Sequence, residues 1–236
     1  MRAPTSRSAG RIAGVTAHHA VGRLADLNCQ EFSRHLARIG GPGAALEERD
    51  GALFCASSTP FPVLFNIAWR TDPELDAATF VHRADEWFAS LGRGWSVMVR
   101  DQTIDDDLRA AVADAGLVSL LDAPAMNITD IPEGREPPDG VELRWLGDQN
   151  RFDDFVTVCD LAYAVSGLPP GTAPEGLRLL RELTAPNIHS VVAYERGRPL
   201  AAAQVLLSHS IGGVYWVGTV PEGGRRGLGD LVTRTP

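Results

Sequence analysis

The fold of this chain is decided by residues 214–236, which read V-Y-W-V-G-T-V-P-E-G-G-R-R-G-L-G-D-L-V-T-R-T-P. Residues 214–220 are rich in β-branched and aromatic side chains and predict a strand. Pro221 ends that strand, because proline has no N–H to donate to the ladder. A glycine-rich, doubly basic loop follows at 223–229, and residues 230–234 predict the opening of a helix.

A strand, a glycine loop and a helix start in this order predict a phosphate-binding cradle. Glycines let backbone N–H groups come close to an anion, and a helix N-terminus favours negative charge. Arg225 and Arg226 add two cations to the loop. The spacing matches neither the dinucleotide fingerprint G-x-G-x-x-G nor the Walker loop G-x-x-x-x-G-K-[ST]. The loop therefore indicates an anion site of another kind.

The segment resembles the coenzyme A loop of the GNAT acyltransferase superfamily, [Q/R]-x-x-G-x-[G/A], which follows a strand and a V-x-P-like turn. In this chain the motif falls on Gly224-Arg225-Arg226-Gly227-Leu228-Gly229. The first position holds Gly224, where the family carries Arg or Gln. Arg225, one residue further on, is the candidate to replace that cation.

The resemblance implies acetyl-CoA as cosubstrate and an amine as acceptor. Backbone groups of the strand would hold the pantetheine arm, at Val217, Gly218, Thr219 and Val220. The loop amides would hold the pyrophosphate, at Arg225, Arg226, Gly227, Leu228 and Gly229.

In the family the amine attacks the thioester directly, without a covalent enzyme intermediate, so a base is needed to take the amine proton. The segment offers two weak candidates. Glu222 lies beside the loop, with a solvated turn residue as the alternative interpretation. Tyr215 alternates with Trp216 on the expected strand, so one ring should face the core and the other the cleft, and core packing is the alternative for both.

Composition describes an ordinary globular protein, with 44% hydrophobic and 22% charged residues. A net charge of -8 argues against nucleic acid as a partner, and no apolar run reaches the length of a membrane span. We expect a cytoplasmic protein without a membrane partner. The three cysteines and six histidines show no metal-binding spacing, so no metal is expected, and the cysteines are expected to be small core residues.

The chain divides at residues 131–140, I-P-E-G-R-E-P-P-D-G, a linker rich in proline, glycine and charge. Residues 1–20 lack clear periodicity and are expected to be a flexible tail. The domains expected on either side of the linker are 21–130 and 141–236. The expected fold class is α/β (α+β), a mixed, mostly antiparallel GNAT-like sheet flanked by helices, in two halves.

The first half shows alternating helix and strand patterns. Helices are expected at 20–39, 75–91 and 105–115, and strands at 52–57, 63–69, 95–99, 117–121 and 125–129. This order, with A-V-A-D-A-G-L at 111–117, is similar to the later part of a GNAT fold. Residues 70–73 contain no glycine, so this half would be a degenerate, non-binding copy; an unrelated α/β domain is the alternative.

The second half resembles the opening of the GNAT fold. Its expected helices are 148–165 and 174–183, and its expected strands are 141–146, 189–194, 199–208 and 214–220. Members of the family continue with further strands after the loop helix, so this half is expected to be truncated, with an unpaired sheet edge. The first half could cover that edge, a homodimer could, or the chain could be part of a longer protein.

Three functions therefore remain open. The first is an N-acyltransferase that moves an acetyl group from acetyl-CoA to an amine of a small molecule or protein. The second is a catalytically inactive acyl-CoA-binding or interaction protein derived from such an enzyme. The third is an unrelated α/β domain in which the glycine loop is only a turn.

Overall fold

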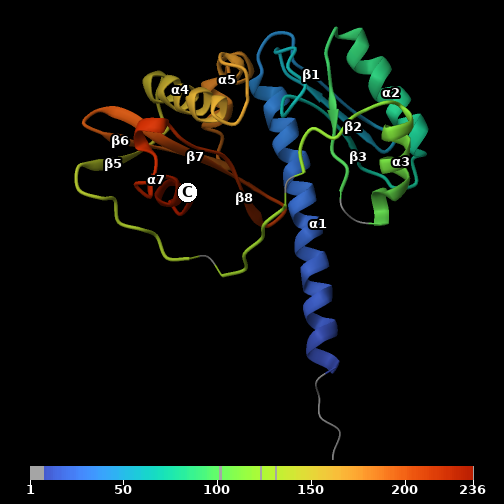
Figure 1. Ribbon diagram of the computed structural model, residues 1–236, viewed down its shortest axis with the longest axis horizontal. Coiled ribbons are helices and arrows are strands. Elements are labelled where there is room, and N and C mark those ends of the chain that lie inside the picture. The colour runs from blue at the N-terminus through green and yellow to red at the C-terminus, as the bar shows by residue number, and fades with distance from the viewer. Residues whose placement is uncertain (1–7, 101–102, 123, 131, 236) are drawn as a thin grey trace, which may run out of the picture.

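A computed structural model describes residues 8–100, 103–122, 124–130 and 132–235. Its described residues form two four-stranded sheets, in the orders β1-β2-β3-β4 and β5-β6-β7-β8. The long helix α1 (Ser8–Ile39) runs between the two sheets (Figure 1). The mixed, mostly antiparallel sheets with flanking helices confirm the expected fold class.

The first sheet is antiparallel except for its last pair, β3 with β4. Its strands alternate between two cores: Leu53 and Cys55 of β2 pack with residues of α1, whereas Phe54 packs under α2. The elements are β1 (Ala45–Arg49), β2 (Ala52–Ala56), β3 (Asn66–Arg70), α2 (Ala77–Ser90), β4 (Ser96–Val97), η1 (Thr103–Asp105) and α3 (Asp106–Asp114).

The second sheet is antiparallel throughout. A Cβ on Gly218 would lie 2.7 Å from Cβ of Ala162 in α4, whereas a Cβ on Gly229 of α7 would lie 3.3 Å from Oγ1 of the next strand residue, Thr219. The two helices therefore cover opposite faces of the sheet (Figure 1). The elements are β5 (Val141–Trp145), α4 (Gln149–Ala164), α5 (Thr172–Gly176), α6 (Leu180–Leu183), β6 (Ile188–Glu195), β7 (Arg198–Ser208), β8 (Ile211–Thr219), η2 (Pro221–Gly223) and α7 (Leu228–Thr233).

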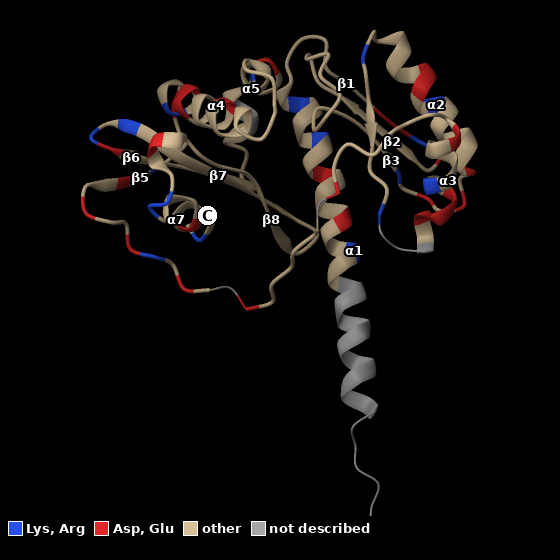
Figure 2. Ribbon diagram, in the orientation of Figure 1, with Lys and Arg blue, Asp and Glu red and all other residues tan. Residues whose placement is uncertain are grey.

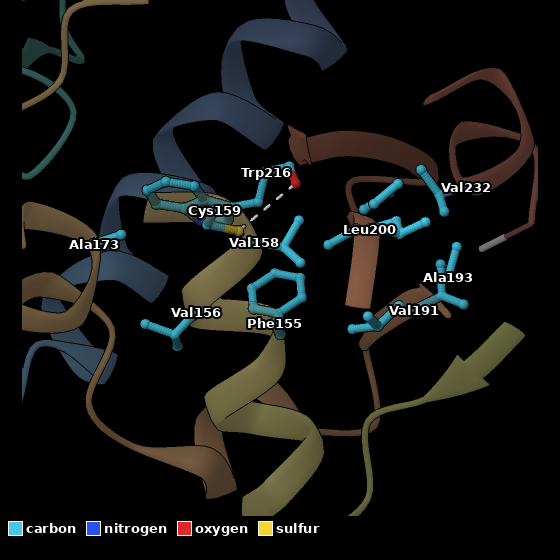
Figure 3. Close-up of a cluster of buried hydrophobic side chains, with 14 of the residues drawn as sticks. Phe155, Val156, Val158, Cys159, Ala173, Val191, Ala193, Leu200, Trp216 and Val232 are labelled. Carbon is cyan, nitrogen blue, oxygen red and sulfur yellow. Dashed lines mark hydrogen bonds between the residues drawn. The ribbon is translucent and has the colours of Figure 1, made fainter. Parts of the chain in front are cut away.

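The main core lies between this second sheet and its helices (Figure 3). Phe155, Cys159 and Trp216 are buried there, and the Cys159 thiol lies 4.0 Å from the carbonyl oxygen of Trp216. Residues from the first half join the same core: Leu36 and Ile39 of α1, and Phe65. The two halves therefore share buried apolar surface instead of packing as separate bodies.

Helix α1 is longer than expected, and one strand is new. The helix begins at Ser8 and not near residue 20, so residues 8–19 of the expected flexible tail are helical; residues 1–7 lie outside the described part. The stretch contains no proline, and a helix propagates at a much lower cost than it nucleates once the packed segment after it has formed. Strand β1 has the helix-favouring sequence A-L-E-E-R, and pairing with β2 overrides that preference.

Two further expectations are wrong. The segments 117–121 and 125–129 are not strands, and Val118, Leu121 and Met126 are exposed at 75%, 72% and 89%. Strand β4 next to them has two residues and offers almost no ladder to extend. The helix expected at 174–183 is broken into α5 and α6 at Gly176, which packs so closely on Phe65 that a Cβ would lie 2.0 Å from its ring.

Candidate functional site

Strand β8 is irregular just before the glycine loop. The register of β7 and β8 shifts between the pairs Ala202–Gly218 and Gln204–Tyr215, because β8 contains one more residue than β7 in this interval. Trp216 lies in this β-bulge with a φ of 52°, a conformation that costs a residue with a side chain about 1–2 kcal/mol. A bulge leaves one residue outside the hydrogen-bond ladder. The strand therefore presents unpaired backbone close to its end.

The bulge also places both aromatic rings of β8 in the same core. Tyr215 stacks on Phe32 of α1, with ring centroids 3.7 Å apart, and its hydroxyl donates to Oδ1 of Asn28 at 2.6 Å. Trp216 packs between Phe65 and Tyr163. Core packing of both rings, the alternative interpretation, is therefore confirmed, and neither ring faces a cleft, since the extra residue breaks the strand's alternation. Burial raises the pKa of the Tyr215 hydroxyl, so it stays protonated and cannot accept the amine proton.

The end of β8 brings the strand and the loop together. Val217 is exposed at 36%, whereas Val220 is buried. A Cβ on Gly218 would collide with Ala162, so this glycine allows α4 to approach the strand. On the opposite face a Cβ on Gly229 would lie 3.3 Å from Oγ1 of Thr219. The residues expected to hold the pantetheine arm therefore adjoin those expected to hold the pyrophosphate.

The loop itself keeps a run of free N–H donors. The amides of Gly223 and Gly224 donate within the turn, to Val220 O at 2.9 Å and Pro221 O at 3.1 Å. The amides of residues 225–230 donate to no acceptor in the described part of the chain. Gly227 has a φ of 76°, the left-handed conformation that favours glycine. Successive free amides in such a turn form an anion-binding concavity.

The charges around the loop are partly engaged. Figure 2 shows basic positions on the loop that leads into α7. Arg226 pairs with Glu195, Nη1 to Oε2 at 3.1 Å, and this hydrogen bond holds the pKa of the Glu195 carboxyl below its usual range. Arg225 forms no ion pair with any described residue and is exposed. Helix α7 has only six residues, so the arginines and free amides, more than a helix dipole, supply the positive potential.

Of the two expected bases, only Glu222 is open to solvent. It lies in η2, directly after β8, and is exposed. It is also the single carboxylate between residues 214 and 229. Helix α7 begins at Leu228, two residues earlier than the sequence predicts. The side chain of Leu228 is buried in the core.

The corresponding turn of the first half, between β3 and α2, differs in how its amides and its arginine are hydrogen-bonded. The amides of Thr71 and Asp72 donate to Gly51 O at 2.8 and 3.2 Å, and Glu74 N donates to Asp72 Oδ1 at 2.9 Å. Arg70, which ends β3, is buried and binds Asp107, with Nη1 to Oδ2 at 2.6 Å. The amides of Thr71, Asp72 and Glu74 in this turn are therefore engaged within the fold, and so is the guanidinium of Arg70.

The sequence did not point to two residues that adjoin the site. Arg135 of the linker contacts Asp230 of α7, and Asn28 of α1 holds Tyr215. No short sequence pattern indicates either contact, because 95 positions separate Arg135 from Asp230 and 187 separate Asn28 from Tyr215. The described residues contain no cluster of side chains able to hold a metal ion. In the described part of the chain, no helix is both long and apolar enough to cross a membrane.

Comparison with solved structures identifies the fold. A GCN5-related N-acetyltransferase from Kribbella flavida is 16% identical, with a TM-score of 0.59 over 87% of this chain and 78% of that one. A GCN5-related N-acetyltransferase-like protein from Streptococcus suis is 10% identical over 86% and 82%, with a TM-score of 0.45. No protein-family model and no curated protein sequence matches the chain. The first likeness confirms the GNAT-like fold that the sequence predicts.

Proposed function

We propose that this protein is an N-acetyltransferase that moves an acetyl group from acetyl-CoA to an amine, and that residues 217–229 form its coenzyme site. The observation that carries the proposal is the run of unpaired amides at 225–230, which directly follows a bulged strand in a GNAT-like fold. In the corresponding turn of the first half the amides of Thr71, Asp72 and Glu74 are paired and Arg70 is bound by Asp107, so we assign no coenzyme site there.

In this proposal the residues of the site bind and orient the substrate. The free amides of the loop and Arg225 neutralise the pyrophosphate. The backbone of Trp216 and Val217, which the bulge leaves outside the β7–β8 pairing, holds the pantetheine arm by strand-like hydrogen bonds. When acetyl-CoA is bound, amine attack on its thioester carbonyl forms the amide bond, breaks the C–S bond and releases the thiol. Holding both reactants in register supplies much of the rate.

Glu222 is our candidate for accepting the amine proton. Its carboxylate stands at the junction of strand and loop, whereas the Tyr215 hydroxyl is already bonded to Asn28. A Glu222→Gln variant should keep its affinity for acetyl-CoA and lose turnover. Equal turnover in this variant and the wild type would exclude Glu222 as the base.

The proposal is tested by two measurements on the purified chain. Calorimetric titration with acetyl-CoA should give one site per chain. Release of free thiol from acetyl-CoA, followed with a thiol reagent, should then depend on an added amine from a panel of polyamines, amino sugars and lysine peptides. A folded protein that binds no acetyl-CoA would refute the proposal.

A second function is favoured by one observation. The Tyr215 hydroxyl is engaged in a hydrogen bond to Asn28, and Glu222 is the one candidate base left in the strand-loop segment. A chain that binds acetyl-CoA without transferring its acetyl group would be an acyl-CoA-binding protein. Stoichiometric binding with no thiol release across the amine panel is the result that would select this alternative.

A further inference from the structure

The linker between the halves reaches the coenzyme loop through one side chain. Nη1 of Arg135 donates to Oδ2 of Asp230 at 3.1 Å, and a Cβ built on Gly227 would lie 3.0 Å from the same nitrogen. The guanidinium of Arg135 therefore lies against the glycine at the centre of the loop. Its neighbours Glu133 and Glu136 are exposed and form no ion pair with described residues. Arg135 is thus a specific point of contact in an otherwise open linker.

This contact is poorly suited to a purely structural role. Both side chains of the ion pair are largely in water, exposed at 51% and 44%, and such pairs contribute little net stability. Asp230 has a second partner, because Nε of Arg234 donates to its Oδ1 at 2.7 Å. Asp230 would therefore remain paired if Arg135 moved away, so the guanidinium can change partner at small cost.

The loop, in turn, lacks a cation at one place. Gly224 occupies the position where the coenzyme A motif carries Arg or Gln, and Arg226 is engaged by Glu195. A pyrophosphate carries more charge than the Asp230 carboxylate and offers several oxygens to a planar guanidinium. An anion seated on the free amides of 225–230 would therefore compete for Arg135.

We propose that Arg135 is a pyrophosphate-binding residue of the coenzyme site, supplied by the linker in place of the cation missing at Gly224. When coenzyme A binds, the Arg135 guanidinium leaves the Asp230 carboxylate and binds the pyrophosphate. This contact holds the linker against the loop. This inference rests on the proposed function, since it needs coenzyme A to bind at residues 217–229.

The first test is calorimetric titration with coenzyme A. Arg135→Gln should weaken binding about tenfold, the usual effect of losing one charge-assisted contact. Arg49→Gln, which removes an exposed, carboxylate-paired positive charge in the first half, is the matched control and should bind like wild type. Equal affinities for the two variants would overturn the inference and leave the proposed function intact. No binding by folded wild type would overturn both.

The second test separates phosphate binding from bracing of the loop. Asp230→Asn removes the carboxylate that competes for Arg135 and should tighten coenzyme A binding. If the pair instead braced the loop, Asp230→Asn and Arg135→Gln would both weaken binding, and the inference would fail. Dephospho-coenzyme A, which keeps the pyrophosphate and lacks the 3′-phosphate, should show the same loss with Arg135→Gln. A loss confined to coenzyme A would remove the assignment to the pyrophosphate.

Discussion

Asn28 of α1 should be a main support of the strand that carries the proposed coenzyme site. Its side chain is 1% exposed and donates from Nδ2 to Leu206 O at 3.1 Å and to Ser208 Oγ at 2.7 Å, and it accepts from the Tyr215 hydroxyl at 2.6 Å. Replacing it by alanine removes three hydrogen bonds that join the two halves. At about 1 kcal/mol for each bond, Asn28→Ala should lower the free energy of unfolding by about 3 kcal/mol.

The Tyr215 hydroxyl provides an internal check on this value. Tyr215→Phe alone removes the hydrogen bond to Asn28 and a weaker one to Cys29 Sγ at 3.6 Å, and should cost about 1 kcal/mol. In the Asn28→Ala background that hydroxyl keeps only Cys29 Sγ as an acceptor at 3.6 Å, so Tyr215→Phe should cost little or restore stability. The two substitutions should thus be coupled by about 1 kcal/mol.

Urea denaturation followed by tryptophan fluorescence measures all four species of this cycle. Asn187→Ala is the control, because its exposed amide makes a 3.3 Å hydrogen bond to Leu207 O at the same edge and should contribute little. Additive costs for Asn28→Ala and Tyr215→Phe, or equal costs for Asn28→Ala and Asn187→Ala, would refute the assignment of Asn28 as the support of β8.

Three further predictions concern single positions. Gly227→Val, at a φ of 76°, should abolish acetyl-CoA binding in calorimetry while costing only about 1–2 kcal/mol of stability; wild-type affinity would contradict the loop assignment. Burial lowers the pKa of His35 from 6.5 to about 4, so stability is fully present above pH 6.5 and falls by about 3 kcal/mol as the pH drops toward 4. In urea melts of His35→Gln the free energy of unfolding should depend less on pH than in wild type. An unchanged dependence would exclude His35 as its source. Gly176→Ala, which sets a Cβ 2.0 Å from the Phe65 ring, should cost about 3 kcal/mol, whereas Gly134→Ala in open space should be neutral.

The strands and helices with regular periodicity could be predicted from the sequence. Strands β6 to β8 and helix α4 fall close to the expected positions, because their cores are local and their turns carry glycine or proline. The apolar residues of α1 do not follow a single helical face in the sequence, and the structure gives the reason. Phe32 and Leu36 pack on the second sheet, while Cys29 and Ala37 pack on the first, so two faces of one helix are buried.

The site was predictable only in its local part. The glycines and arginines of the loop are contiguous, so their pattern is visible in the sequence. The bulge at Trp216 is set by the pairing of β7 with β8, and the sequence gives no sign that it places both rings of β8 in one core. Arg135 and Asn28 reach the site through the arrangement of whole elements, which sequence spacing does not encode.

The central claim, that coenzyme binds the loop after β8, is tested most directly by hydrogen–deuterium exchange with and without acetyl-CoA. Because the amides of residues 225–230 have no acceptor among the described residues, they should exchange rapidly in the free protein. The account predicts strong protection of a peptide spanning 217–230 when acetyl-CoA is added, and no change in a peptide spanning 70–77 of the first half. Protection of 70–77 instead, or no protection of 217–230 at saturating acetyl-CoA, would contradict it.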